Sequence, residues 1–353
     1  MRNDGFTWDI GERAYSEDFF KNKTILVTGG CGSIGSEIVR QLLKYSPKEI
    51  RVYDIDEARL FWLDQNLQDK KIKCVVGDIK DRERLHSSME NVDVVFHAAA
   101  LKHVPICEHN PMETVATNII GTQNVVDTVI ANNVGWFVGI STDKAAKPFN
   151  VMGATKLLSE RLITRASMGR NTKFGCVRFG NVLVSSGSLI PTIKGQIESG
   201  NSVTITHKDM TRFFMSIDEA VQLVLKTTLS MDNGEIFIPK MSSVRIVDLI
   251  EVLIEEFAPQ FGKKPKDIKR RIIGVRPGER IHESLMSDEE TQYMREERDR
   301  YIVQSPLLYS YDAKGQKGKN IGTKIFEYNS STTPLLNKKE IKKLLLKGNV
   351  FSF

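Results

Sequence analysis

The chain contains 353 residues, of which 41% are hydrophobic and 27% are charged, and this composition excludes a disordered or fibrous protein. The length predicts two lobes, or one large domain with an appended lobe. The formal net charge of +6 raises the question of a nucleic-acid or acidic lipid partner. The excess is local, however, because residues 313–353 carry a net charge of +7 and the first 312 residues sum to −1. We therefore expect no nucleic-acid partner and interpret this basic tail as an assembly or docking element.

Four scattered cysteines without a CxxC pair indicate a reducing compartment, and we expect a cytoplasmic protein without a metal site. Residues 1–20 lack the apolar core of a signal peptide. No run approaches the roughly 18 apolar residues that would span a bilayer, so we expect no membrane insertion.

Short β-rich runs alternate with helical patterns through the first half of the chain. The candidate strands are Thr24–Thr28, Ile50–Asp54, Lys73–Val76, Val92–His97 and Trp136–Ile140. The helical patterns between them are Ser33–Leu43, Glu57–Gln65, Pro111–Ala131 and Asn150–Ser167. This order predicts an α/β fold with a doubly wound parallel sheet, the Rossmann arrangement.

From about Val182 the alternation of strand and helix patterns stops. It resumes with a helix at Ile217–Lys226 and a strand at Glu235–Pro239. Residues 313–323 and 329–334 have loop composition, and Lys338–Leu346 has that of a short basic helix. We therefore expect four parts: an extension at 1–22, a dinucleotide-binding domain at 23–181 plus 216–241, a smaller discontinuous lobe at 182–215 plus 242–312, and the tail at 313–353.

A glycine-rich turn follows the first strand, with Gly29, Gly32 and Gly35 leading into a helix that Ser33 or Ser36 could cap. Glycine suits a sharp turn, close approach to a pyrophosphate, and tight packing of helix on strand. The alternative is an ordinary strand–helix turn. Asp54 ends the next strand, at the spacing where a carboxylate accepts hydrogen bonds from an adenosine ribose.

No basic residue follows Asp54 before Arg59, whereas Asp56 and Glu57 would repel a ribose 2′-phosphate. The sequence therefore favours NAD, with NADP still possible. Asp78 ends the third strand, where it could reach the adenine amine or cap the next helix.

The fifth strand runs into Ser141, Thr142, Asp143 and Lys144, at the strand ends where α/β proteins place their ligands. On the following helix, Met152 and Lys156 are four residues apart and share one face. The alternative for Asp143 and Lys144 is an exposed turn pair worth under about 1 kcal/mol.

Several motifs together resemble the extended short-chain dehydrogenase/reductases, and among them the 4,6-dehydratases acting on UDP-N-acetylglucosamine. The similarity covers about residues 22–290 and rests on TGGCGSIGSE, HAAALKHVP, TNIIGTQNV, STDKAAKPFNVMGATK, VRFGNV, MTRFFM and GVRPGERIHE. The segment FEYNSSTTPLL is also similar to capsule-type members that epimerise C5.

One position departs from the superfamily pattern. Its usual Tyr-x-x-x-Lys is Met152-x-x-x-Lys156 here, and a thioether cannot accept a proton from a sugar hydroxyl. An inactive nucleotide-binding relative is one interpretation. We favour an active enzyme because a subset of these dehydratases is similar in carrying Met, and the Thr-Asp-Lys trio is retained.

The resemblance implies that the cofactor takes hydride from sugar C4 and returns it to C6 after water leaves. It implies that Lys144 is the C5 base, if burial and Lys156 lower its pKa, and that a protonated Asp143 serves the departing C6 hydroxyl. Thr142 would hydrogen-bond the C4 oxygen, and Lys156 would hold the nicotinamide ribose. The proton that Tyr normally accepts would leave through Asp143 or a water.

The same resemblance implies a set of binding residues. Those for the cofactor are Gly29, Gly32, Ser33, Ile34, Gly35, Asp54, Asp78, Ile79, Ala98, Ala99, Ala100, Asn118 and Lys156. Those for the substrate are Lys102, Asn181, Arg212, Arg276, Glu279 and Glu283. Among these, Asn181, Arg212 and Arg276 would grip a nucleotide diphosphate. Glu283 would contact the uridine ribose. Asn118 alternatively is a buried amide satisfied by backbone.

These observations predict a UDP-N-acetylglucosamine 4,6-dehydratase with NAD, serving bacterial polysaccharide or glycan synthesis. Three alternatives stay open: dehydration with C5 epimerisation, a UDP-hexosamine 4-epimerase, and a nucleotide-binding scaffold. We also expect a homo-oligomer, a dimer or larger ring, because members of the superfamily commonly pair through two helices flanking the sheet.

Overall fold

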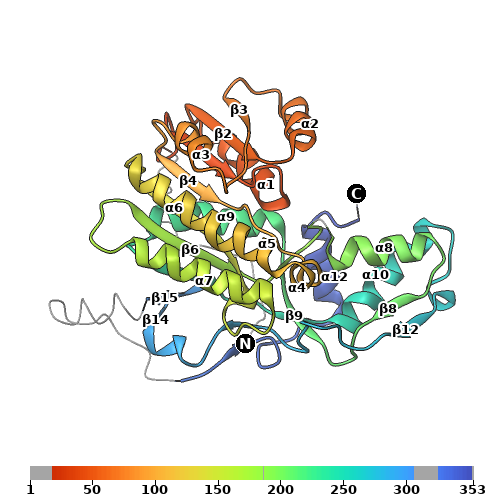
Figure 1. Cartoon of the computed structure of the whole chain (residues 1–353). Helices are drawn as coiled ribbons and strands as arrows, with labels where there is room; N and C mark the ends of the chain where they lie inside the picture. The colour runs from red at the N-terminus through yellow and green to blue at the C-terminus, as the bar shows by residue number, and fades with distance from the viewer. Residues whose placement is uncertain (1–17, 186, 306–324, 352–353) are drawn as a thin grey trace.

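The computed structural model describes residues 18–185, 187–305 and 325–351, so the loop expected at 313–323 and most of the extension lie outside the described residues. A nine-stranded sheet runs through the larger part of the molecule in the order β14-β15-β10-β6-β5-β4-β1-β2-β3 (Figure 1). Its parallel strands are β1 (Thr24–Thr28), β2 (Glu49–Asp54), β3 (Ile72–Val76), β4 (Val94–His97), β5 (Trp136–Thr142), β6 (Lys173–Phe179) and β10 (Glu235–Pro239). The expected doubly wound parallel sheet is confirmed.

Helices cover both faces of this sheet. On one face α1 (Ser33–Leu43) packs against α9 (Ile217–Ser230), which also contacts β5 and β6. On the other, α6 (Thr122–Ala131) packs against α3 (Arg82–Ser88) and α7 (Val151–Ala166). The remaining helices of this part are α2 (Glu57–Leu67), α4 (Val104–His109) and α5 (Pro111–Val115).

The single helix expected over 111–131 is interrupted. Between α5 and α6 the chain forms a π-helical turn, η1 (Ala116–Gly121), which contains Asn118. Such turns are frequent at functional sites because the wider ring alters the direction of the side chains.

A smaller lobe lies beside the sheet and has a core of its own. It contains α8 (Leu189–Glu198), α10 (Ile246–Gln260) and α12 (Lys338–Lys347), with the short strands β8 (Val203–Ile205) and β12 (Arg270–Ile272) (Figure 1). Three strands join it to the larger part, namely β7 (Asn181–Val182), β9 (Thr211–Met215) and β11 (Ser243–Arg245), which form one sheet.

The division at residue 312 is wrong for the described part of the tail. Ile341 and Leu345 of α12 are fully buried in the core of the small lobe, and Lys342 pairs with Glu256 of α10 at 2.5 Å. Helix α12 is therefore an integral part of the lobe, held by apolar burial and by charge pairing, instead of an extension that docks elsewhere.

The assignment of all of 242–312 to the small lobe is also wrong. Residues Arg300–Gln304 form β15, which pairs antiparallel with β10, and Met294–Glu296 form β14 at the edge of the large sheet. The preceding β13 (Ser284–Met286) pairs with β16 (Tyr328–Asn329). The chain therefore returns to the large sheet after leaving the lobe and extends it at one edge.

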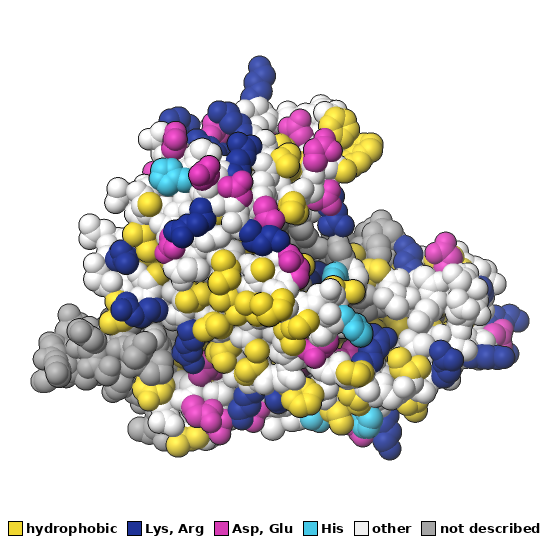
Figure 2. Space-filling view, in the orientation of Figure 1, with side chains coloured by type: hydrophobic (Ala, Val, Ile, Leu, Met, Phe, Trp, Pro, Cys, Tyr) yellow, Lys and Arg dark blue, Asp and Glu magenta, His cyan; other side chains and the backbone are white. Residues whose placement is uncertain are grey.

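Hydrophobic side chains gather on the surface over α5 to α7 in Figure 2. Met112, Ile120 and Leu158, from neighbouring helical segments, are all exposed. The homo-oligomer that the resemblance implies stays a prediction. Within the described ranges, no helix combines the length and apolar character needed to cross a membrane.

A buried ion cluster fixes the returning chain to the sheet. Arg178 of β6 is fully buried, donates to both carboxylate oxygens of Glu160 on α7 and of Glu290, and donates to the carbonyl of Leu285. Ser141, beside Thr142 in β5, also donates to Glu160. The cluster thus ties together strand β5, helix α7 and the segment that follows β13.

Replacing Glu160 with Gln should lower the free energy of unfolding by about 1–3 kcal/mol, because it weakens charge-assisted hydrogen bonds to Arg178 while Glu290 still pairs with the guanidinium. Urea denaturation measures the loss. Glu255→Gln is the matched control, because Glu255 and its partner Lys338 are half-exposed at 3.6 Å, and its effect should stay within about 0.5 kcal/mol. Equal losses in the two variants would contradict a structural role for the cluster.

Candidate active site

The glycine-rich turn is built for close backbone contact. Gly29 has a φ of 64°, and a Cβ there would lie 2.5 Å from the backbone nitrogen of Ala99. A Cβ on Gly35 would lie 2.2 Å from the carbonyl oxygen of Gly29. Gly32 itself is the N-cap of α1, so neither Ser33 nor Ser36 caps the helix as expected. Any side chain at Gly29 or Gly35 would push β1, α1 and the loop after β4 apart.

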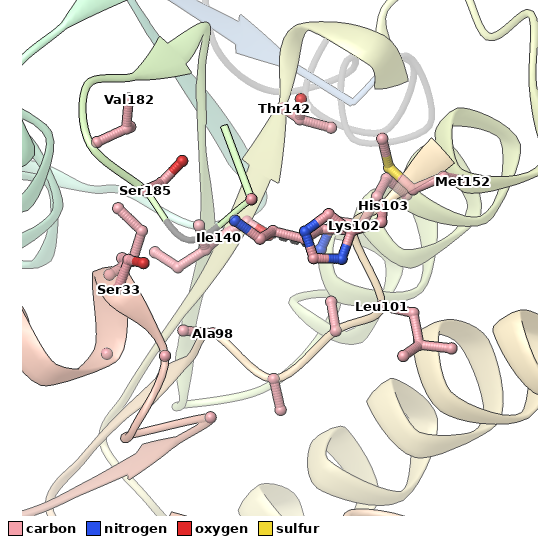
Figure 3. A pocket seen from close by; sticks show the side chains of 18 of the residues that line it. Ser33, Ala98, Leu101, Lys102, His103, Ile140, Thr142, Met152, Val182 and Ser185 are labelled. Atoms are coloured by element: carbon pink, nitrogen blue, oxygen red, sulfur yellow. Dashed lines mark hydrogen bonds between the residues drawn. The ribbon is translucent and has the colours of Figure 1, made fainter. Parts of the chain in front are cut away.

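A cavity of about 720 Å³ opens at this turn, between the carboxyl ends of the parallel strands and the small lobe. That volume lies within the usual range for small-molecule sites. Figure 3 shows Ser33 and Ala98 on one side, Val182 and Ser185 from the small lobe on another, and Thr142 and Met152 at the far end. The predicted residues that line it are Gly29, Gly32, Ser33, Ile34, Gly35, Asp54, Asp78, Ile79, Ala98, Ala99, Ala100, Lys102, Thr142, Lys144, Met152, Lys156 and Asn181.

Asp54 is fixed at the end of β2 by two backbone groups. Its Oδ2 accepts from the N–H of Cys31 at 2.9 Å and its Oδ1 from that of Asp56 at 3.1 Å. The carboxylate is therefore oriented at the cavity wall, next to the glycine-rich turn. Its contact with an adenosine ribose stays a prediction.

Two cations that the sequence argument left aside also line this end of the cavity. Arg59 pairs with Asp56 at 3.2 Å, and Lys80 pairs with Glu113 at 2.6 Å. The sequence argument, which considered only the residues directly after Asp54, therefore understated the positive charge at this end of the cavity. Each of the two cations already has a carboxylate partner. The capping interpretation of Asp78 is wrong, because the N-cap of α3 is Asp81.

Asn118 does not line the cavity. Its Oδ1 accepts from the N–H of Leu101 at 2.8 Å, and its Nδ2 donates to the carbonyl of Leu101 at 3.0 Å and to Thr155 at 3.0 Å. The buried amide thus holds the loop that carries Ala98 to Lys102, and the alternative of an amide satisfied by backbone describes it better than direct cofactor contact.

The trio at the end of β5 forms a connected cluster. Thr142 donates through its hydroxyl to Oδ1 of Asp143 at 2.8 Å, and Lys144 Nζ lies 3.0 Å from the same oxygen. Asp143 is 1% exposed, and its Oδ2 has no hydrogen-bond partner among the described residues. A hydroxyl at the cavity wall is therefore connected to a buried carboxylate that retains a free acceptor.

The expected lowering of the Lys144 pKa is wrong. Burial alone lowers it, but the carboxylates of Asp143 and Glu283 outweigh burial, so the pKa of Lys144 stands above its ordinary value. Lys156 is not among the groups that shift the pKa of Lys144. The Lys156 Nζ donates to the carbonyl of Ile140 at 2.6 Å, and burial lowers the pKa of Lys156. The two carboxylates therefore favour the ammonium form of Lys144.

Three residues predicted to bind the substrate, two of them its diphosphate, are placed differently from expectation. Arg212 is buried, and its two terminal nitrogens donate to the carbonyls of Thr211, Arg280 and Ile281. Arg276 and Glu279 lie outside the cavity lining, and the Arg276 side chain is 52% exposed. Two of these side chains are thus displaced from the cavity, and the third is occupied by backbone.

Glu283 occupies another place again. Its carboxylate is buried, with Oε1 3.5 Å from Lys144 Nζ and 3.8 Å from Arg212 Nε. Glu283 therefore lies beside the lysine of the trio, and its contact with a uridine ribose stays a prediction.

A loop of the small lobe also lines the cavity, although none of its residues was predicted as a site residue. Ser185, Gly187 and Ser188 line it, and Gly187 lies so close to His103 that a Cβ there would be 2.6 Å from the imidazole Nε2. Two residues of this loop, Val184 and Gly187, have positive φ angles of 59° and 70°, and the spacing of its serines carries no signal of a site.

His97, at the end of β4, supports the loop behind the cavity as a neutral ring. It is fully enclosed, with Nδ1 2.7 Å from the hydroxyl of Thr28 and Nε2 3.0 Å from that of Thr122. Burial, with the charge of Lys156, lowers the His97 pKa to about 3.

Comparisons place this geometry among known proteins. A family model described as "Polysaccharide biosynthesis protein" matches residues 25–305. The "Uncharacterized membrane protein MJ1061" of Methanocaldococcus jannaschii is 55% identical, over 93% of this chain and 96% of that protein. The "UDP-N-acetylglucosamine 4,6-dehydratase (inverting)" of Campylobacter jejuni is 39% identical, over 92% and 98%. A "UDP-glucose 4-epimerase" of Rickettsia massiliae is 38% identical, over 93% and 96%.

Among solved structures, the X-ray structure of Pen from Bacillus thuringiensis superposes with a TM-score of 0.87 at 40% identity, covering 94% of this chain and 99% of that one. The fold is that of the extended short-chain dehydrogenase/reductases. The chain belongs to the polysaccharide biosynthesis protein family.

His97 should make stability depend on pH. Because its folded pKa lies below the unfolded value, its contribution is complete above about pH 6.5 and is lost as pH falls toward 3, by up to about 1.4 kcal/mol per pH unit. Urea titrations of the wild type and His97→Gln at pH 7, 5 and 4 test this. The wild type should lose more stability than the variant over that range, and parallel losses would contradict the assignment.

Proposed function

We propose that this protein is an NAD-dependent UDP-N-acetylglucosamine 4,6-dehydratase that forms a UDP-4-keto-6-deoxy-N-acetylhexosamine for surface polysaccharide or glycan synthesis. The observation that carries the proposal is the cluster at the end of β5, where a hydroxyl, a buried carboxylate and a lysine are in mutual contact beside a dinucleotide-sized cavity. Simple C4 epimerisation requires no acid–base pair directed at C5 and C6. The name of the Campylobacter relative supports the same substrate.

NAD suits the described residues. The turn at Gly29 and Gly35 admits no side chain, the N-terminus of α1 faces the cavity, and Asp54 is oriented at the wall. Bound there, NAD would supply the hydride acceptor for C4 and the hydride donor for C6. Lys156, on the face of α7 that it shares with Met152, would hold the nicotinamide ribose.

The C4 hydroxyl proton has a path that needs no tyrosine. When the sugar C4 oxygen lies at Thr142, the Thr142 hydroxyl accepts the proton of the C4 hydroxyl. The Thr142 hydroxyl passes its own proton to Asp143 Oδ1, 2.8 Å away. Asp143 then holds one proton in a closed environment. Met152 contributes shape to this wall and takes no part in proton transfer.

Asp143 and Lys144 then divide the elimination between them. Lys144, as the neutral amine, removes the C5 proton that the C4 ketone acidifies, and Asp143 gives its acquired proton to the C6 hydroxyl, which leaves as water. Lys144 afterwards returns a proton to C5. Every proton taken from the sugar is thereby returned to product or to water.

Product analysis in deuterated water tests the proposal. Incubation with UDP-N-acetylglucosamine and NAD should give a 4-keto-6-deoxy sugar carrying deuterium at C5, and the NMR spectrum also reports the C5 configuration. UDP-N-acetylgalactosamine would instead identify a 4-epimerase, which the name of the Rickettsia relative makes the second candidate. Absence of turnover with NAD bound would identify a scaffold.

Two variants separate the proton steps. Lys144→Ala should abolish C5 exchange while NAD stays bound, and Thr142→Val should slow C4 oxidation by about 10²–10⁴-fold, whereas Thr142→Ser retains the hydroxyl and most activity. Lys147→Ala is the matched control, because Lys147 lies nearby in sequence but pairs with Asp288 and Glu327. Normal exchange in Lys144→Ala would remove that lysine from the role of C5 base.

A further inference from the structure

Glu283 brings a buried carboxylate from the segment before β13 to the lysine at the end of β5. The residue is 5% exposed and its Oε1 lies 3.5 Å from Lys144 Nζ. Backbone pairing holds it there, since the Glu283 N–H donates to the hydroxyl of Ser330 at 3.0 Å and the Ser330 N–H donates to the Glu283 carbonyl at 2.8 Å. These two bonds hold the backbone of Glu283 without using its carboxylate.

The proposed chemistry leaves a difficulty at Lys144. A base must be neutral, yet two carboxylates stabilise the ammonium form of this lysine. Asp143 cannot take the surplus proton, because in the proposed cycle its carboxylate must be vacant to receive the proton of the C4 hydroxyl. A second acceptor within reach of Nζ is required.

Glu283 has the properties of that acceptor. The charged groups that face it are Lys144 and Asp143 from the end of β5 and Arg212 from β9. Burial and the negative charge of Asp143 raise the pKa of Glu283 above its ordinary value, against the lowering effect of Lys144 and Arg212. The neighbouring His282, whose ring contacts Thr211, has a pKa lowered by burial and by Arg212.

We propose that Glu283 is a positioning residue that accepts a proton from Lys144 and so generates the neutral amine that acts at C5. One N–H bond of Lys144 breaks and one O–H bond of Glu283 forms, so an ion pair becomes a neutral pair and the net charge of the cluster is unchanged. The proton stays on Glu283 while Lys144 takes and returns the C5 proton, and passes back after product leaves. This inference rests on the proposed function.

The pH dependence of C5 exchange distinguishes this role from a structural one. In the wild type the amine forms by internal transfer, so the rate should be flat between about pH 6.5 and 8.5. In Glu283→Gln the proton must leave to solvent, so the rate should be about 10²-fold lower at pH 7 and should rise nearly tenfold per pH unit. Glu283→Asp, which retains a carboxylate, should restore part of the rate and the flat profile.

Glu327→Gln is the matched control, because Glu327 pairs with Lys147, whereas Glu283 pairs with Lys144 of the trio. Its rate and profile should equal those of the wild type. Thermal melting and NAD binding confirm that each variant is folded.

The outcomes are distinct. A flat profile in Glu283→Gln, whether the rate is normal or uniformly reduced, overturns the inference and leaves the proposed function standing. A similar, pH-independent loss of the C5 exchange rate in Glu283→Asp also overturns the inference and leaves the proposed function standing. Absence of wild-type product overturns the proposed function, and this inference with it. If Glu283→Gln does not fold, the flat profile and partial rate of Glu283→Asp against the control decide the question.

Discussion

The contact between Lys144 and two carboxylates is the interaction around which the candidate site is arranged. Asp143 is adjacent in the chain, so its contact follows from the local turn after β5. Glu283 comes from a segment that has crossed from the small lobe, so its contact exists only when both parts of the molecule are in place. The protonation state of one lysine thereby depends on the arrangement of the whole chain.

The buried cluster of Arg178 explains how that arrangement is maintained. Arg178 binds Glu160 on α7 and Glu290 just beyond β13, while Ser141 binds Glu160 from the strand that ends in Thr142. The helix that carries Met152 and Lys156, the strand that carries the trio and the segment that carries Glu283 are thus connected through one guanidinium. All five of its N–H groups are used, which offsets the cost of burying the charge.

The parts of the fold that depend on local pattern could be predicted from the sequence. The alternation of strand and helix patterns predicts the parallel strands, including β2 with Asp54 at its end. The steric needs of glycine predict the turn at Gly29. The parts that depend on distant pairing could not. Helix α12 has a basic composition typical of a free tail, yet its two buried residues complete the core of the small lobe.

The same distinction holds for the site. Thr142, Asp143 and Lys144 are consecutive, so their proximity is a property of the sequence. Arg212 and Glu283 were assigned from the resemblance, and the Arg212 guanidinium, which is suited to phosphate, is here occupied by three backbone carbonyls. Residue type states what a side chain is able to bind, whereas only the fold determines which partner reaches it first.

A crystal structure of the complex with NAD and UDP-N-acetylglucosamine tests the central claim most directly. The sugar C4 oxygen should lie within hydrogen-bonding distance of the Thr142 hydroxyl, with C5 facing Lys144 Nζ and Glu283 still in contact with that amine. A complex in which the C4 oxygen lies away from Thr142, or in which the diphosphate occupies the end of the cavity at Lys144, would contradict it.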